Sequence, residues 1–270
     1  MASGKQSKRR RRAAEVAPPP VRAKGQRRQA SPRVLIAAAV LLAMIVVGLV
    51  LGLALSGTSS GSPARSAPRH GSLANALPGA TAVDQLLKGI PQHGNVLGSP
   101  TAPATLVEYV DLQCPYCQQF ETQAMPTLIK HYVRTGKAKI ELRPIAFIGP
   151  DSQRGRSAAI AAGRQNRMFN FAELLYLNQR GENTGWLNDA TITATAASIP
   201  GLDVPSLLEQ RNSASTGSQA GAFDRLATSD QVTSTPTILV GKSGHALRRV
   251  TLASPGEARS VASALDTALR

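Results

Sequence analysis

The sequence predicts an α/β domain over residues 79–270, in which a small sheet carries an inserted block of helices. A transmembrane helix and a disordered basic tail are predicted to precede it. Three observations predict this organisation: composition changes sharply along the chain, apolar strand and helix patterns begin only after Gly79, and a long helical stretch separates the first strands from the last. We therefore expect a packed core only in the last block of the chain.

Residues 1–33 form the predicted tail, which carries eleven Lys or Arg residues against one acid, Glu15. It has no apolar periodicity and contains three consecutive prolines, so it cannot bury enough surface to offset the entropy of ordering. The chain has a formal net charge of +15, and most of it lies here. Nucleic acid or anionic lipid could bind such a tail, but ordinary membrane electrostatics suffice, and we expect no nucleic-acid partner.

Residues 34–55 are predicted to be a transmembrane helix because about 22 residues without charge or proline can cross a hydrocarbon core of about 30 Å. A cleaved secretory signal is the alternative, but its apolar region usually has only about 7–15 residues. The basic residues crowd before this segment, so the positive-inside rule places the N-terminus in the cytoplasm. We expect a single-pass protein of the cell membrane whose main domain is extracytoplasmic.

Residues 56–78 are rich in Ser, Gly, Pro and Ala and are predicted to be a flexible linker. A linker of this kind spans about 25–30 Å on average, which keeps the domain at 79–270 near the membrane but free to turn. The low aromatic content of 4% and the abundance of Arg, Ala and Gly are typical of a GC-rich, for instance actinobacterial, genome.

The first strand and helix of the domain surround a pair of cysteines. Ala104–Asp111 is predicted to be a buried strand. Pro115 suits the first position of a helix with apolar residues at helical spacing, and Gly136 supplies a left-handed stop. Pro126 is expected to kink that helix.

The rest of the domain is predicted to return to the sheet only near its end. A second strand is expected over 140–147, interrupted by Pro144. Residues from about 152 to 228 are expected to be an inserted helical block, broken at 181–185, 200–201 and 213–217. Strands are expected at 236–240 and 246–252.

The last predicted helix has a clear start signal. Ser254 suits the N-cap, Pro255 the first position, and Glu257 completes a capping box. The apolar face of this helix consists of Val261, Leu265 and Leu269.

Cys114 and Cys117 are the two cysteines of the chain, in the motif Cys-Pro-Tyr-Cys. No framework of structural disulfides is possible within one copy. Zinc usually needs four ligands in compact pairs, and the four histidines are scattered without ligand spacing, so we expect no metal. A static bridge or two inert thiols is a further alternative, and a redox pair is favoured.

The placement of the pair supports redox chemistry. A helix that begins at the motif puts Cys114 at its N-terminus, where free backbone N–H groups and the helix dipole favour a thiolate. Cys114 should be the nucleophile, and Cys117, one turn further in, should be the resolving thiol. Pro115 and Tyr116 are the spacer.

The stretches Leu-Gly-Ser-Pro-Thr-Ala-Pro at 97–103 and Glu-Tyr-Val-Asp-Leu-Gln-Cys-Pro-Tyr-Cys-Gln-Gln-Phe at 108–120, with Thr235-Pro236 opening a later strand, resemble the DsbA-like branch of the thioredoxin fold. The resemblance covers residues from about 95 to the C-terminus. It implies that Pro236 is cis and lies against the cysteine pair, and that the backbone there pairs with an extended substrate chain.

The resemblance also implies a buried proton-transferring carboxyl group at Glu108, six residues before Cys114. The alternative is that Glu108 faces solvent or pairs with a Lys or Arg. One departure from DsbA concerns Tyr116, which stands where DsbA has a histidine that stabilises the thiolate. We therefore predict a redox potential between those of DsbA and thioredoxin.

The predicted function is that of an extracytoplasmic dithiol oxidase that introduces disulfides into reduced, exported protein substrates. The resemblance implies reoxidation by a quinone-linked membrane partner of the DsbB or VKOR type, with no cofactor bound to this chain. One alternative is a disulfide reductase or isomerase, for instance in cytochrome c maturation, because the motif does not set the direction of exchange. Another is a non-catalytic, membrane-tethered binding or assembly module with the same fold.

Overall fold

The computed structural model describes residues 68–270 of the chain. The predicted tail, the apolar segment 34–55 and most of the predicted linker lie outside these residues. Within the described part, no helix combines the length and the apolar character needed to cross a membrane. The strands are β1 (Gln92–His93), β2 (Val96–Leu97), β3 (Ala104–Val110), β4 (Ala138–Pro144), β5 (Thr237–Lys242) and β6 (Arg248–Val250).

The helices lie before, between and after these strands. They are α2 (Ala80–Leu87), α3 (Pro115–Gln119), α4 (Met125–Leu128), α5 (Pro150–Gly163), α6 (Met168–Leu177), α7 (Asp189–Ala197), α8 (Val204–Gln210), α9 (Ala214–Ser229) and α10 (Arg259–Ala268), with π-helical stretches η1 (Phe120–Ala124) and η2 (Ile129–Val133). This order agrees with the predicted α/β fold with a helical insertion.

The six strands form one sheet in the order β1-β2-β4-β3-β5-β6. β3 pairs in parallel with β4 and antiparallel with β5, so it lies between the two. All seven residues of β3 are buried. A strand buried on both faces is almost continuously apolar, which explains why this segment was recognisable from sequence.

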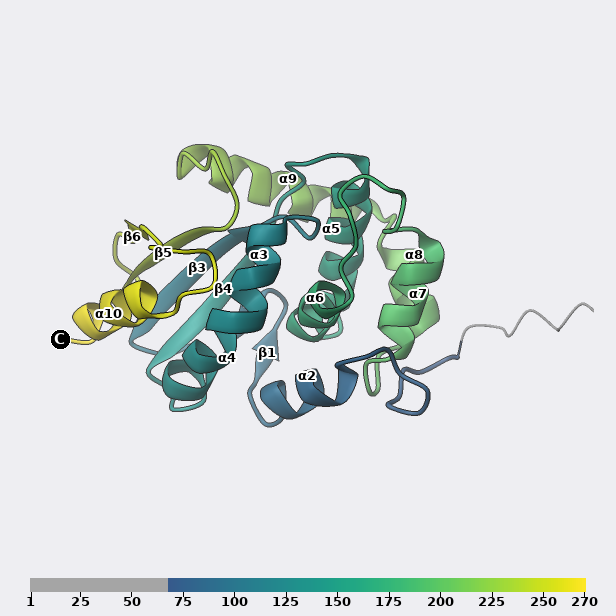
Figure 1. The fold of residues 1–270 in the computed structure, drawn as a ribbon, viewed down its shortest axis with the longest axis horizontal. Coiled ribbons are helices and arrows are strands. Elements are labelled where there is room, and N and C mark those ends of the chain that lie inside the picture. Colours follow the sequence, from purple (N-terminus) through teal and green to yellow (C-terminus); the bar gives the residue numbers. More distant parts are fainter. Residues whose placement is uncertain (1–67) are drawn as a thin grey trace, which may run out of the picture. The chain divides into compact units, whose positions relative to one another are not determined.

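The inserted helices α5 to α9 connect β4 to β5. In Figure 1, α5 to α8 gather on the right of the view, and α9 runs across the top toward the strands. The helical run from α3 to η2 and the C-terminal α10 lie in front of the sheet in the same view. β3 thus ends beside both the α3 run and the insertion, where the chain reaches Cys114.

The helical run after Cys114 is not one continuous α-helix. Proline has no N–H to donate to the preceding turn, and η1 lies directly before α4, in which Pro126 occupies the first turn. The expected disturbance therefore appears as a π-helical stretch. The run is followed by Gly136 with φ 73°, the predicted left-handed stop.

Two predicted boundaries in the strands and the last helix are wrong. β4 ends at Pro144 instead of residue 147, because proline has no N–H to donate to the strand ladder. Pro144 lies opposite Val110, which is the last residue of β3 in this ladder. The last helix begins at Arg259, and Ser254 is not its N-cap. The Glu257 carboxylate instead accepts hydrogen bonds from the backbone N–H groups of Arg259 and Ser260, at 3.0 and 3.2 Å.

The helical insertion and the last strands also differ in their limits from the prediction. The break expected at 213–217 lies at 211–213 instead, and α9 begins at Ala214, because the Ser213 side chain caps the helix by accepting from the Thr216 N–H at 3.2 Å. An unpredicted break at 164–167 separates α5 from α6. β5 extends two residues past the predicted end, and β6 is shorter than predicted.

The folded unit starts before Gly79. His70 forms a β-bridge with Asp203, and the Gly71 N–H donates to the Leu202 carbonyl at 2.8 Å. The Gly71 carbonyl accepts from the Gly201 N–H at 3.0 Å. The C-terminal end of the predicted linker is therefore packed against the helical insertion, and the boundary at residue 78 is too late.

Candidate active site

The turn between β3 and α3 places Cys114 at the start of the helix. Cys114 is the N-cap residue and Pro115 occupies the first turn, as predicted. The Cys114 N–H donates to the Asp111 carbonyl at 2.9 Å, and its carbonyl accepts from the Gln118 N–H at 3.0 Å. The Cys114 sulfur therefore lies where unpaired backbone N–H groups and the helix dipole favour a negative charge.

The two thiols have opposite acidities. A hydrogen bond from Cys117 is the main cause that lowers the pKa of Cys114, from 9.0 to about 6. Cys117 has no exposed surface, and burial raises its pKa well above the ordinary value. At neutral pH the pair is thus a Cys114 thiolate that accepts a hydrogen bond from a neutral Cys117 thiol.

Thr235 and Pro236 lie directly beside this pair. The peptide bond between them is cis, which confirms the prediction for Pro236. When Cys114 is protonated, its thiol donates to the Thr235 carbonyl at 3.3 Å. The loop before β5 is therefore in contact with the sulfur that is predicted to react.

A hollow of about 450 Å³ opens next to the cysteine motif. Tyr116 lines it and is 56% exposed, which is high for an aromatic side chain. The other walls are the Thr235-Pro236 loop and the segment 249–255. An extended chain placed here would lie alongside both the spacer of the motif and the cis peptide bond.

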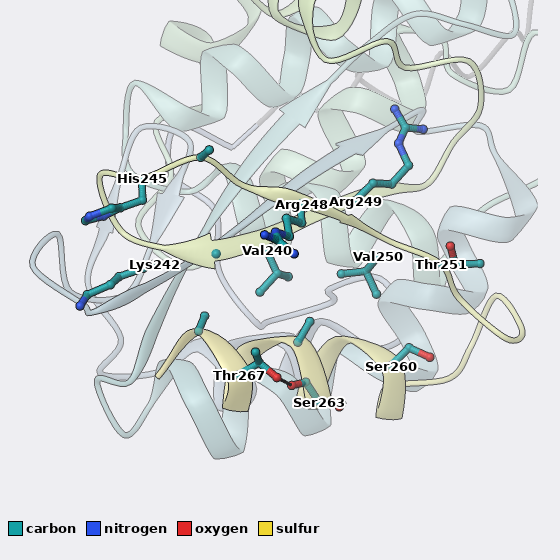
Figure 2. A pocket seen from close by; sticks show the side chains of 14 residues that line it. Val240, Lys242, His245, Arg248, Arg249, Val250, Thr251, Ser260, Ser263 and Thr267 are labelled. Carbon is teal, nitrogen blue, oxygen red and sulfur yellow. Dashed lines mark hydrogen bonds between the residues drawn. The ribbon is translucent and has the colours of Figure 1, made fainter. Parts of the chain in front are cut away.

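A larger groove of about 650 Å³ adjoins this hollow, between the β5–β6 hairpin and α10 (Figure 2). Lys242 and His245 lie at one end, and Thr251 and Ser260 lie at the other. Of the described residues that line the groove, none is acidic. The groove therefore continues from the active-site hollow as a surface with positive charge.

Glu108 lies in the middle of β3 and has no exposed surface. Burial, followed by the charge of Glu121, raises its pKa well above the ordinary value. Neither of its carboxyl oxygens has a hydrogen-bond donor outside the neighbouring carboxyl groups. The solvent-facing alternative is thus wrong, and among residues 68–270 no Lys or Arg pairs with Glu108.

Sequence reasoning missed Asp111 and Gln113, which hold the cysteine turn in place. The Asp111 carboxylate accepts from the backbone N–H groups of Gln113, Phe147 and Ile148. The Gln113 side chain donates to Ser152 at 2.9 Å and accepts from the Asn183 N–H at 2.7 Å. A polar residue at the end of an apolar strand was the available signal, but its partners are distant in sequence.

Side chains of the helical insertion also hydrogen-bond to the turn between β3 and α3. The Tyr176 hydroxyl donates to the Asp111 carbonyl at 3.1 Å. The Gln179 side chain donates to the carbonyls of Leu112 and Cys114, at 3.2 and 3.3 Å. The insertion thus fixes the backbone that carries the first cysteine.

Within the described residues, no group of three or more His, Cys, Asp or Glu side chains could hold a metal ion.

Comparison with known proteins supports the same fold. A probable disulfide bond formation protein D of Bacillus cereus is 30% identical over 111 residues, which are 40% of this chain and 51% of the relative. The disulfide bond formation protein D of Bacillus subtilis is 26% identical over 156 residues, 57% of this chain and 68% of the relative. The chain thus spans about half the length of the Bacillus cereus relative.

The crystal structure of oxidised BdbD from Bacillus subtilis has a TM-score of 0.57 at 22% identity, and the match covers 67% of this chain and 97% of that chain. This likeness shows a thioredoxin-like fold with a helical insertion. Residues 92–250, more than half of the chain, match the model of a family described as thioredoxin. The chain therefore belongs to this thioredoxin family.

Proposed function

We propose that the protein is a thiol–disulfide oxidoreductase that works through Cys114 and Cys117. The observation that carries the proposal is the opposite acidity of the two thiols: the pKa of Cys114 is lowered to about 6, and that of Cys117 is raised. Disulfide exchange needs a thiolate as nucleophile or leaving group. The pair supplies one reactive sulfur and one sulfur that stays protonated.

The proposed reaction starts from the oxidised pair. A client thiolate attacks the Cys114 sulfur, the Cys114–Cys117 bond breaks, and Cys117 receives its electrons and a proton. A second client thiolate then attacks the client sulfur of this mixed disulfide, and Cys114 leaves as a thiolate. The client gains one disulfide, and the enzyme pair gains two electrons.

Oxidation of clients is the proposed direction. A stabilised thiolate makes the reduced enzyme more stable and so makes the oxidised enzyme a stronger oxidant. A pKa of about 6 for Cys114 lies between about 3.5 for DsbA and about 7 for thioredoxin, which supports an intermediate potential. The names of the Bacillus relatives refer to disulfide bond formation, which agrees with this direction.

The client is proposed to bind as an extended chain across the hollow at Tyr116 and the Thr235-Pro236 loop. Backbone groups of this loop lie within reach of the reacting sulfur, because the Thr235 carbonyl already contacts Cys114. The basic groove next to it would accept the continuation of the chain, favouring acidic segments.

The location and the partner belong to the same proposal. The apolar segment 34–55 would anchor the protein in the cell membrane with the N-terminus in the cytoplasm, and the domain would meet reduced exported proteins outside. A quinone-linked membrane oxidase of the DsbB or VKOR type would reoxidise the pair. Tethering would keep the two within reach.

The test mixes the oxidised full-length chain, in detergent, with a reduced protein that requires disulfides for activity. We expect rapid oxidation of this client and an equilibrium potential against glutathione between about −270 mV for thioredoxin and about −120 mV for DsbA. Rapid reduction of disulfides without oxidation of the client would instead favour the reductase or isomerase.

A matched pair of cysteine variants separates enzyme from binding module. Cys114→Ser should lose client oxidation completely. Cys117→Ser should keep the nucleophile and, when mixed with a client that already carries a disulfide, should attack that bond and accumulate a mixed disulfide, because no second thiol is present to resolve it. Gel electrophoresis without reductant detects that adduct. A protein whose cellular activity survives Cys114→Ser would be a binding or assembly module.

A further inference from the structure

A row of polar side chains crosses one face of the sheet beside the Thr235-Pro236 loop. Tyr109 of β3 is the register partner of Arg143 of β4 on one side and of Thr237 of β5 on the other. Register partners in adjacent strands direct their side chains to the same face of a sheet. Arg143, Tyr109 and Thr237 therefore lie side by side, and Thr237 is the residue that directly follows Pro236.

The Tyr109 hydroxyl joins this row to Asp230, the C-cap residue of α9. It donates to the Asp230 carboxylate at 2.6 Å and accepts from the Arg143 guanidinium at 2.6 Å. Arg143 also donates to Asp230 at 3.4 Å and to Glu141 at 2.9 Å. Tyr109 has no exposed surface, and burial, followed by the hydrogen bond to Asp230, raises its pKa to about 12. The hydroxyl therefore keeps its proton and remains a donor at neutral pH.

Arg249 of β6 holds the backbone at the same place. Its guanidinium donates to the carbonyls of Asp230 and Gln231, at 2.8 and 2.9 Å. Figure 2 shows Arg249 pointing away from α10, opposite to Val240 and Val250. Side chains from β3, β4 and β6 thus converge on the end of α9. Together these residues form the loop anchor, defined here as Arg143, Tyr109, Asp230 and Arg249.

The loop anchor fixes the start of the loop 230–236, and the end of this loop contacts Cys114. The Thr237 hydroxyl donates to the Ser234 carbonyl at 2.7 Å, which closes the loop onto β5. The Thr235 carbonyl lies 3.3 Å from the Cys114 sulfur. A short loop that is held at both ends has few conformations. The position of the Thr235 carbonyl relative to the sulfur therefore depends on the loop anchor.

The same loop forms one wall of the hollow at the cysteine motif. Backbone hydrogen bonds to an extended chain need donor–acceptor distances of about 2.7–3.2 Å, so a small displacement of the loop would break them. A small thiol without a peptide backbone reaches the sulfur without using these groups. Displacement of the loop should therefore impair attack by a peptide much more than attack by a small thiol.

We propose that Tyr109, Arg143 and Asp230 are positioning residues that hold the loop 230–236 where an extended client chain can pair with it beside Cys114. This inference rests on the proposed function, because the client is the molecule that uses the loop. The hydrogen bonds of these side chains run to one another and to Glu141, so they act on the reaction only through the loop. Arg249 also lines the hollow, so its substitution would not separate anchoring from client contact.

The first test compares two thiols that attack the oxidised, full-length chain in detergent. One is a neutral cysteine peptide, which can lie along the loop, and the other is 2-mercaptoethanol, which has no backbone. Stopped-flow measurements give both rate constants. We expect the ratio of the peptide rate constant to the mercaptoethanol rate constant to fall about tenfold in Asp230→Ala and about threefold in Tyr109→Phe, because hydrogen bonds to the client are lost.

Two further variants separate positioning from general stability. Asp230→Asn keeps an oxygen that can accept from Tyr109, so it should restore most of the ratio. Tyr132→Phe is the matched control, because the Tyr132 hydroxyl also donates to a carboxylate, that of Asp266 on α10, at 2.8 Å. It should leave the ratio unchanged. An unchanged ratio in Asp230→Ala, or an equal loss in Tyr132→Phe, would overturn the proposal.

A second measurement does not depend on clients. Hydrogen exchange followed by mass spectrometry should show faster exchange in Asp230→Ala that is confined to the segment 230–236. Unchanged exchange in this segment, or faster exchange throughout the domain, would overturn the proposal. If the natural sequence reacts with the peptide no faster than with mercaptoethanol, the proposed client site is wrong. Faster exchange confined to 230–236 would then still show that the loop anchor holds the loop.

Discussion

Two acids only three residues apart, Asp111 and Glu108, are equally buried but have opposite surroundings. Asp111 accepts hydrogen bonds from three backbone N–H groups, at 2.9, 2.7 and 2.8 Å. Glu108 has only other carboxyl groups as partners. The difference separates an acid that holds the backbone together from an acid whose carboxyl group holds no backbone group in place. Burial alone therefore does not reveal the role of an acidic residue.

Removing the Asp111 carboxylate should have the largest effect on stability. Asp111→Ala leaves three backbone donors without an acceptor at the cysteine turn, so the free energy of unfolding should fall by about 3 to 5 kcal/mol. Denaturant unfolding of the reduced protein measures this, with Glu209→Gln as the control for loss of an exposed carboxyl group. A loss below about 1 kcal/mol would show that water replaces the carboxylate.

Glu108→Gln should give the reverse result. The unfolding free energy should change by no more than about 1 kcal/mol, because no donor loses its partner. If Glu108 transfers protons as the family resemblance predicts, the rate of disulfide opening should fall about a hundredfold, because Gln cannot donate a carboxyl proton. Stopped-flow measurements give the rate of disulfide opening in the Asp111 and Glu108 variants. A larger decrease of this rate in Asp111→Ala than in Glu108→Gln would contradict the difference between the two acids.

The pH dependence of the redox potential sharpens the contrast. The pKa of Cys114 is lowered from 9.0 to about 6, so the thiolate adds stability to the reduced protein that is complete above pH 9.0 and is lost as the pH falls through about 6. The potential should therefore change by about 59 mV per pH unit below pH 6 and about 30 mV above it.

Redox titration at several pH values locates this change in slope. Glu108→Gln should leave it near pH 6, whereas Asp111→Ala should move it upward, because a loosened turn no longer holds Cys114 at the helix N-terminus. A single slope from pH 5 to pH 8 would contradict the proposed thiolate.

Tyr176→Phe should have the smallest effect. Tyr176 is linked to both acids, because its hydroxyl donates to the Asp111 carbonyl at 3.1 Å, while burial and then nearby charges, that of Glu108 among them, raise its own pKa. Loss of one neutral hydrogen bond should lower the unfolding free energy by about 1 kcal/mol and change the opening rate less than threefold. A larger kinetic effect would make the hydroxyl part of the proton path.

The local parts of the site were predictable from sequence. The positions of Cys114 and Pro115 follow from an apolar strand followed by a proline-started helix, and this pattern is contained in about twenty residues. The resemblance added the cis bond at Pro236 and the buried Glu108, both of which the structure confirms. Local signals and a specific motif sufficed for these residues.

The remaining features depend on tertiary contacts. Asp230 has no special neighbours in sequence, and only the packing of α9 against the sheet brings it to Tyr109. The start of α10 was misplaced because Ser254, Pro255 and Glu257 have the residue types of a capping box, yet the turn at 254–257 precedes the helix. Such patterns show that a capping side chain is present but not which turn it closes.

Both edge strands of the sheet are very short. β1 contains two residues and β6 three, and β6 carries the adjacent arginines Arg248 and Arg249. Short, charged edge strands offer little backbone for another chain to pair with. The proposed clients are unfolded, reduced chains, which expose many strands. The short edge strands of this sheet offer such chains almost no backbone to pair with, so we expect little aggregation between the protein and its proposed clients.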